Sequence, residues 1–113
     1  MVYTVSLTAR AEADAFAAFE RIREASPDSA DRWLLGLFAA IMSLGDMPAR
    51  CPVISEADEL GHVAHYLLYG KRTSVYRIIF DIQATSEIGP RVRVLRIWHG
   101  ARDAIATEDI ETE

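Results

Sequence analysis

The sequence predicts an α+β fold in which four strands form one sheet and two helices pack against it as a two-layer sandwich. Three observations support this prediction: a short alternating segment opens the chain, two helical patterns follow, and three β-rich segments come last. The expected order is β-α-α-β-β-β, with strands near residues 2–7, 65–69, 74–82 and 92–99 and helices near 9–25 and 27–44.

The first strand and the first helix have clear local signals. Residues 3–7 alternate apolar and polar side chains, which is typical of a strand with one buried face. Thr8 is a suitable N-cap for the helix that follows. Phe16, Phe19 and Ile22 recur at helical spacing, and we expect them to form the apolar stripe of this helix together with the alanines around them, Ala9, Ala13 and Ala15.

A second helix is predicted directly after the first one. Ser26 is a suitable N-cap, Pro27 suits the first helical position, and Gly45 suits the C-terminal cap. Because the connection is so short, the two helices must form an antiparallel hairpin. The residues expected on its broad apolar face are Ala30, Trp33, Leu34, Leu37, Phe38, Ile41 and Leu44.

The remaining strands follow a segment that contains two prolines. Residues 48–52 are predicted to form an ordered, extended loop. Hairpin connections at residues 70–74 and 84–90 join the last three strands into an antiparallel meander.

Strict alternation assigns side chains to the two faces of this meander. In the middle strand, Tyr76 and Phe80 are expected to face the helices, with Arg77 on the opposite, free face. In the last strand, alternation groups Arg96 and Trp98 with Val92 and Val94, and it places Arg93, Leu95, Ile97 and His99 on the other side.

Composition indicates a single domain over residues 1–113, with an acidic tail at 103–113 that we expect to be solvated. No apolar run approaches membrane-spanning length, and the first residues do not resemble a secretory signal. Cys51 is the single cysteine and cannot form an internal disulfide. We therefore expect a cytoplasmic protein without a membrane partner.

Charge is unevenly distributed along the chain. Residues 62–102 carry seven basic and two acidic side chains, which is a net charge of +5. Because the whole chain has a net charge of −5, the other residues together carry −10. This asymmetry indicates either a polyanionic or acidic partner for the basic part, or arginines that solvate the outer face of a sheet.

Metal and cofactor signals are weak. His62, His65 and His99 are the only histidines, and no carboxylate or thiol completes the spacing of a zinc site with them. We expect neither a metal nor a cofactor.

The chain resembles the RelE/ParE superfamily of type II toxin–antitoxin toxins, also called plasmid stabilisation proteins. The resemblance runs from about residue 3 to residue 103. The segments that carry it are Tyr3-x-Val5-x-Leu7-Thr8, Ser26-Pro27-x-x-Ala30-x-Arg32-Trp33, Ser43-Leu44 with Pro48 and Pro52, Leu68-Tyr69-Gly70, Tyr76-Arg77-Ile78-Ile79-Phe80 and Val94-Leu95-Arg96-Ile97-Trp98-His99-Gly100-Ala101-Arg102.

The resemblance implies a small bacterial toxin that a cognate antitoxin keeps inactive. ParE-like members poison DNA gyrase without hydrolysis, whereas RelE-like members cleave messenger RNA on the ribosome. It also implies that the antitoxin wraps an extended or helical segment around the toxin. The expected assembly is a homo-oligomer of the toxin or a toxin–antitoxin hetero-oligomer.

The resemblance further assigns candidate catalytic residues. Arg77 matches an arginine of the RelE-like site, and Arg102 matches the arginine that closes the last motif. The RelE-type lysines and late tyrosine are missing, so enzymatic activity is left open. A substitute acid–base pair would combine His99 with His65 or Tyr69.

Two alternatives to an active toxin remain. One is a non-enzymatic RNA-binding domain that uses a basic sheet face, although Tyr76 and Phe80 are predicted to lie on the face opposite Arg77. The other is a degenerate toxin that binds antitoxin without being toxic.

Overall fold

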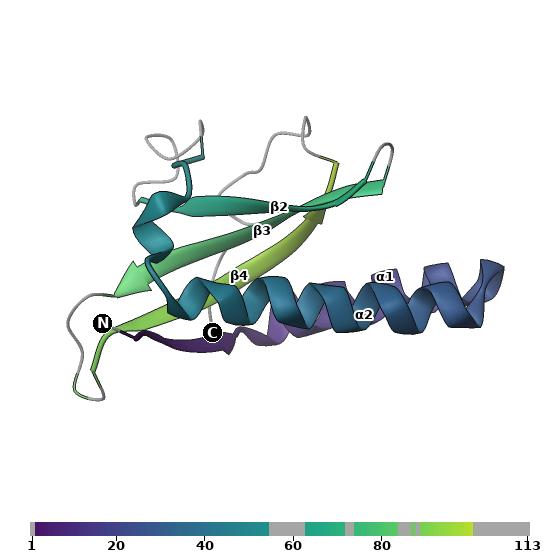
Figure 1. Cartoon of the computed structure of the whole chain (residues 1–113), viewed down its shortest axis with the longest axis horizontal. Helices are drawn as coiled ribbons and strands as arrows, with labels where there is room; N and C mark the ends of the chain where they lie inside the picture. The colour runs from purple at the N-terminus through teal and green to yellow at the C-terminus, as the bar shows by residue number, and fades with distance from the viewer. Residues whose placement is uncertain (1, 55–62, 72–73, 84–86, 88, 101–113) are drawn as a thin grey trace.

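The computed structural model describes residues 2–54, 63–71, 74–83, 87 and 89–100. Its elements follow the predicted order (Figure 1). Among the described helices, none combines the length and the hydropathy needed to cross a membrane. The bounds of the main elements are β1 (Thr4–Leu7), α1 (Ala9–Ala25), α2 (Pro27–Met42), β2 (His65–Lys71), β3 (Ser74–Gln83) and β4 (Arg91–His99).

Two hydroxyl side chains define the helical hairpin, as the sequence predicts. The side chain of Thr8 accepts a hydrogen bond from the backbone N–H of Ala11 and so caps α1. The backbone N–H of Ser26 donates to the last turn of α1, while its side chain accepts from the first turn of α2. One residue therefore ends the first helix and begins the second, and the two helices lie side by side (Figure 1).

The segment after α2 differs from the predicted extended loop. Helix α2 ends at Met42, and two 3-10 turns, Ser43–Gly45 and Pro48–Arg50, follow it. The α-helix predicted near residues 27–44 therefore ends two residues early. The prediction of an extended chain from Pro48 was wrong, because a proline also favours the first position of a helical turn. Met47 adopts a left-handed conformation with φ 49° between the two turns.

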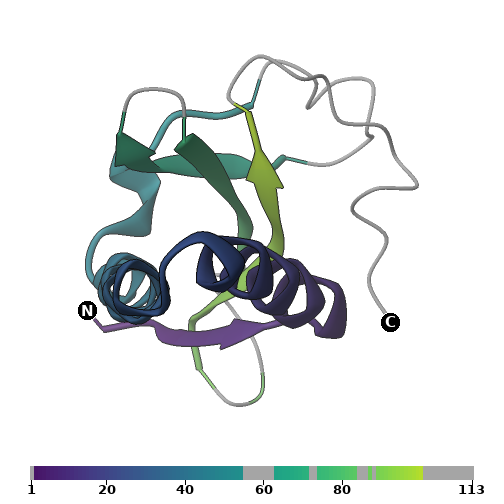
Figure 2. The ribbon, with the colours of Figure 1, turned by 90° about the vertical axis from the view of Figure 1, so that its right-hand side faces the viewer.

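The sheet has the strand order β1-β4-β3-β2 and mixed directions. The predicted antiparallel meander of β2, β3 and β4 is confirmed. Strand β1 pairs in parallel with the first half of β4, from Thr4 opposite Arg91 to Leu7 opposite Val94. Figure 2 shows how this twisted sheet curves around the helices, with the purple β1 below them and the green β2 and β3 above.

The main core lies between the hairpin and the sheet. Tyr76, Ile78 and Phe80 of β3 face the helices, as alternation predicts. The predicted stripe of α1 was correct only in part: Ala15 is buried as expected, but the other buried residues of α1 are Ala11 and Ala18, and Phe16 is exposed. Small side chains let the helix approach the sheet closely, which leaves the phenylalanines of α1 outside the centre of the core.

The opposite face of the sheet is not free, contrary to the prediction. Ile79 and Leu95 are buried there in a second apolar cluster with Ile54 and Ala64. The backbone N–H of Ile54 donates to the carbonyl of Ala64, which ties the segment after the second 3-10 turn to the start of β2. The predicted open surface therefore contains a small core of its own.

A β-bulge in β4 reverses the predicted facing of its second half. Ile79 pairs with Arg96 but Phe80 pairs with Val94, so Leu95 is the extra residue. Beyond the bulge, Ile97 belongs to the main core while Trp98 packs against the second cluster. The assignment of Arg96 and Trp98 to the face of Val94 was wrong for this reason.

A glycine inside α2 makes room for a tyrosine of the sheet. The hydroxyl of Tyr69 donates to the carbonyl of Trp33 at 2.7 Å, and a Cβ added at Gly36 would lie 2.3 Å from that hydroxyl. We expect Gly36→Ala to lower the free energy of unfolding by about 1 kcal/mol, although alanine is the better helix former. In a Tyr69→Phe background the same change should cost clearly less, because the hydroxyl is gone while two ring atoms remain at 3.2 and 3.3 Å. Urea unfolding of the wild type, the two single variants and the double variant measures both costs, and equal effects in both backgrounds would contradict the clash with the hydroxyl.

Candidate functional site

The structure places Arg77 on the sheet face that points away from the helices. It lies in the middle of β3, opposite Leu68 of β2 and Trp98 of β4. Its exposed fraction is only 5%. The expectation of a solvent-exposed arginine was therefore wrong, because the second apolar cluster forms on the same face.

The same face of the sheet carries an ion pair between Asp81 of β3 and Arg93 of β4. Asp81 accepts two hydrogen bonds from Arg93 across the strands, the shorter at 2.6 Å. The hydrogen bond to Asp81 raises the pKa of the Arg93 guanidinium, and burial opposes this shift. The cross-strand register thus gives Asp81 a closer partner than Arg77, which stands four residues away along β3.

His99 lies on the helix side of the sheet, not on the face of Arg77. It is opposite Tyr76, and the two rings stack with centroids 4.6 Å apart and an interplanar angle of 29°. The structure therefore does not bring the predicted residues Arg77 and His99 together. The third one, Arg102, lies outside the described residues.

Neither of the substitute acid–base partners approaches His99. His65 is opposite Phe80, four residues from Tyr76 along β3, which corresponds to about 13 Å. The Nδ1 atom of His65 lies 2.9 Å from the carbonyl oxygen of Cys51. Tyr69 shares the row of Tyr76 and His99, but two strand spacings, about 10 Å, separate it from His99. Burial raises the pKa of the Tyr69 hydroxyl, which makes it a weaker acid.

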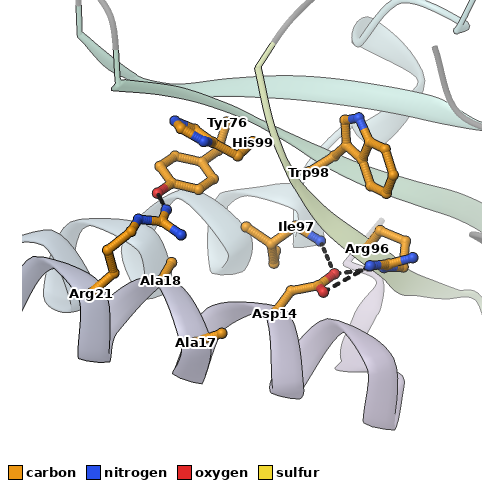
Figure 3. A pocket seen from close by; sticks show the side chains of 9 residues that line it. All are labelled: Asp14, Ala17, Ala18, Arg21, Tyr76, Arg96, Ile97, Trp98 and His99. Carbon is orange, nitrogen blue, oxygen red and sulfur yellow. Dashed lines mark hydrogen bonds and ion pairs between the residues drawn. The ribbon is translucent and has the colours of Figure 1, made fainter. Parts of the chain in front are cut away.

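A polar pocket of about 280 Å³ lies where the end of β4 passes α1 (Figure 3). We call it the α1–β4 pocket. Arg21 donates a hydrogen bond to the hydroxyl of Tyr76, whose ring carries His99 on one face. The lining residues are Asp14, Ala17, Ala18, Arg21, Tyr76, Arg96, Ile97, Trp98 and His99.

An ion pair closes the other end of this pocket. Asp14 accepts two hydrogen bonds from Arg96, at 2.6 and 2.9 Å, and a third from the backbone N–H of Ile97 at 3.0 Å. Strand β1 pairs with β4 only as far as Val94, so Asp14 and Thr8 supply hydrogen bonds along β4 beyond that point. Sequence reasoning missed the α1–β4 pocket, because its lining residues come from α1, β3 and β4 and no local pattern links them.

An apolar groove of about 450 Å³ lies between the two helices and the end of β1. Phe16 is 65% exposed at its edge and Phe38 is 47% exposed. Both residues were predicted to be core, and their exposure corrects that prediction. The residues that line the helical groove, as we name it, are Leu7, Glu12, Ala15, Phe16, Phe19, Leu34 and Phe38.

No metal-binding cluster is found in the part of the chain that the structure describes. Cys51 is buried and reduced, and desolvation raises the pKa of its thiol while nearby Arg50 opposes the shift. A raised pKa lowers the fraction of reactive thiolate at neutral pH.

The strand, the helical hairpin and the antiparallel meander agree with the fold that the resemblance to the RelE/ParE superfamily implies. The family model described as "ParE toxin of type II toxin-antitoxin system, parDE" matches residues 5–104. The chain therefore belongs to the ParE toxin family, and a cognate antitoxin is its implied partner. Comparisons with curated proteins and with solved structures found no match.

Proposed function

We propose that this toxin acts in the bacterial cytoplasm and inhibits growth through DNA gyrase, without cleaving RNA. The observation that carries the proposal is the separation of the candidate catalytic residues onto two faces of the sheet. Arg77 lies beside the second apolar cluster, whereas His99 stacks on Tyr76 on the opposite face of the sheet. The family match to ParE toxins supports the same target class.

Metal-independent RNA cleavage needs several groups around one phosphate. A base must take the 2′-hydroxyl proton, an acid must protonate the leaving oxygen, and cations must stabilise the charge between them. Within the described residues, no acid–base pair of this kind converges on Arg77. We retain Arg77 and Arg102 as residues on which toxicity depends, and not as members of a nuclease site. Because Arg77 is buried, its role would be to hold this face of the sheet in the shape that the target recognises, without touching the target itself.

The RNA-binding alternative has less support. Sheet-based RNA readers stack bases on exposed aromatic side chains. Tyr76 is 3% exposed and Phe80 is fully buried, because both pack beneath the helices. These rings are not accessible to a base.

The helical groove is the best-supported site for the antitoxin. Its floor is apolar, its edges carry exposed phenylalanines, and two helices and a strand end form its walls. An amphipathic helix placed in such a groove would bury the exposed rings, which is a common mode of peptide recognition. Binding there would give a toxin–antitoxin hetero-oligomer.

Induced expression in a bacterium tests the proposed target. We expect growth arrest with gyrase-dependent DNA breaks and intact messenger RNA, and we expect Arg77→Ala and Arg102→Ala to remove the arrest. Because Arg77 is buried, its variant must first be shown to fold by circular dichroism and thermal unfolding; Arg77→Lys keeps a charge and serves as a second variant. Cleaved messenger RNA with unbroken DNA would refute the gyrase proposal, and an absence of growth arrest would indicate a degenerate toxin.

A further inference from the structure

The α1–β4 pocket has one end where three polar groups from three elements meet. Arg21 extends from α1 towards the ring of Tyr76 on β3, and His99 of β4 lies on that ring (Figure 3). None of these groups was assigned a joint role by the sequence or by the family match. Their arrangement is independent of the target that the toxin acts on.

This end of the pocket has N–H and O–H donors that the described hydrogen bonds do not use. The hydroxyl of Tyr76 accepts a bond from Arg21, which leaves its own proton to donate. A guanidinium carries five N–H donors. Within the described residues, Arg21 donates to this neutral hydroxyl and not to a carboxylate. The exposed imidazole of His99 adds another N–H donor.

The carboxylate in the pocket does not cancel this positive end. Asp14 is already bound by Arg96 through two hydrogen bonds and by the backbone N–H of Ile97. That pair is neutral as a unit, so the excess positive charge of the pocket comes from Arg21. An anion at this end would meet positive charge and donors together.

Small residues on α1 provide the space. Ala17 and Ala18 line the pocket between Asp14 and Arg21, and the volume of about 280 Å³ exceeds what a single phosphate group needs. A ligand that carries a phosphate on a small organic group therefore fits better than a bare halide or a long polymer segment.

We propose that the α1–β4 pocket binds a phosphate group, either free phosphate or the terminal phosphate of a small molecule such as a nucleotide. The planar fork of Arg21 can bond two phosphate oxygens, and the donors of Tyr76 and His99 lie at the same end of the pocket. The site is a binding site and not a catalytic one, since no step of bond cleavage is assigned to it.

Side-chain NMR of the purified full chain tests the proposal, with inorganic phosphate and thymidine 5′-monophosphate as separate probes. We expect saturable shifts of the His99 ring and of the Arg21 Nε–H signal. Arg21→Gln should weaken binding about tenfold or more, and Tyr76→Phe should weaken it by a smaller factor while keeping the ring stack. Binding of both probes assigns the phosphate itself, whereas binding of the nucleotide alone assigns a phosphate with an attached group.

Two matched variants separate a specific site from general attraction. Arg32→Gln removes another exposed helix arginine, one that bonds the Ser29 hydroxyl outside this pocket, and it should leave binding unchanged. Ala17→Glu places a carboxylate four residues before Arg21 on the same helix face and should weaken binding as strongly as Arg21→Gln does. Equal losses in the Arg32 and Arg21 variants, or acetate binding as tightly as phosphate, would overturn the proposal.

Discussion

Replacing Asp14 with alanine is expected to destabilise the toxin by about 2–4 kcal/mol, more than any other single change to a polar side chain described above. The carboxylate holds the guanidinium of Arg96 and the backbone N–H of Ile97 at the same time. Both side chains of the ion pair are largely buried, with exposed fractions of 18% for Asp14 and 13% for Arg96. Removing the acid leaves a poorly solvated cation and an unsatisfied N–H at the edge of the sheet.

Urea unfolding measures the decrease in the free energy of unfolding that Asp14→Ala causes, and an exposed ion pair provides the control. Glu20 accepts a hydrogen bond from Arg23 on the same helix, but these side chains are 39% and 55% exposed. Glu20→Ala should therefore cost less than about 0.5 kcal/mol. Asp14→Asn should fall between the two, because its amide oxygen still accepts from Ile97. If Asp14→Ala and Glu20→Ala cost the same, the edge of β4 does not depend on this carboxylate.

The order of elements was predictable because the signals for it are local. Thr8 and Ser26 cap their helices through side chains that stand next to the residues they bond, so sequence spacing alone reveals them. The alternation along β3 also needed no tertiary information. The core face of α1 was misread in part, since hydrophobic patterns favour phenylalanine over alanine as core although close packing on a sheet favours the smaller residue.

The candidate sites were not predictable in the same way, because they depend on long-range register. One extra residue at Leu95 turns His99 towards Tyr76 and Trp98 towards Arg77. The sequence of residues 91–99 contains no local signal that predicts this bulge. Similarly, the partner of Asp14 lies 82 positions away along the chain, and no local pattern links the two residues.

Changing Phe16 or Phe38 to glutamate is expected to weaken antitoxin binding by about 2–4 kcal/mol, roughly thirtyfold to a thousandfold in Kd. Both rings lie at the helical groove and expose 65% and 47% of their surface. A bound apolar segment would cover them, and a glutamate in their place would be buried without a partner. The fold itself should tolerate Phe16→Glu well, since that side chain contributes little to the core in the absence of a partner.

Leu35→Glu is the matched control for this prediction. Leu35 is an exposed apolar residue of α2, 71% accessible, but it does not line the helical groove. Calorimetry with the product of the neighbouring antitoxin gene should give a native-like Kd for Leu35→Glu and a much weaker one for Phe16→Glu. In cells, the Phe16 variant should then arrest growth even when the antitoxin is co-expressed, because toxicity and neutralisation use different surfaces. Equal loss of affinity in the two variants would place the antitoxin elsewhere on the hairpin, and loss of toxicity in the Phe16 variant would show that the groove also serves the target.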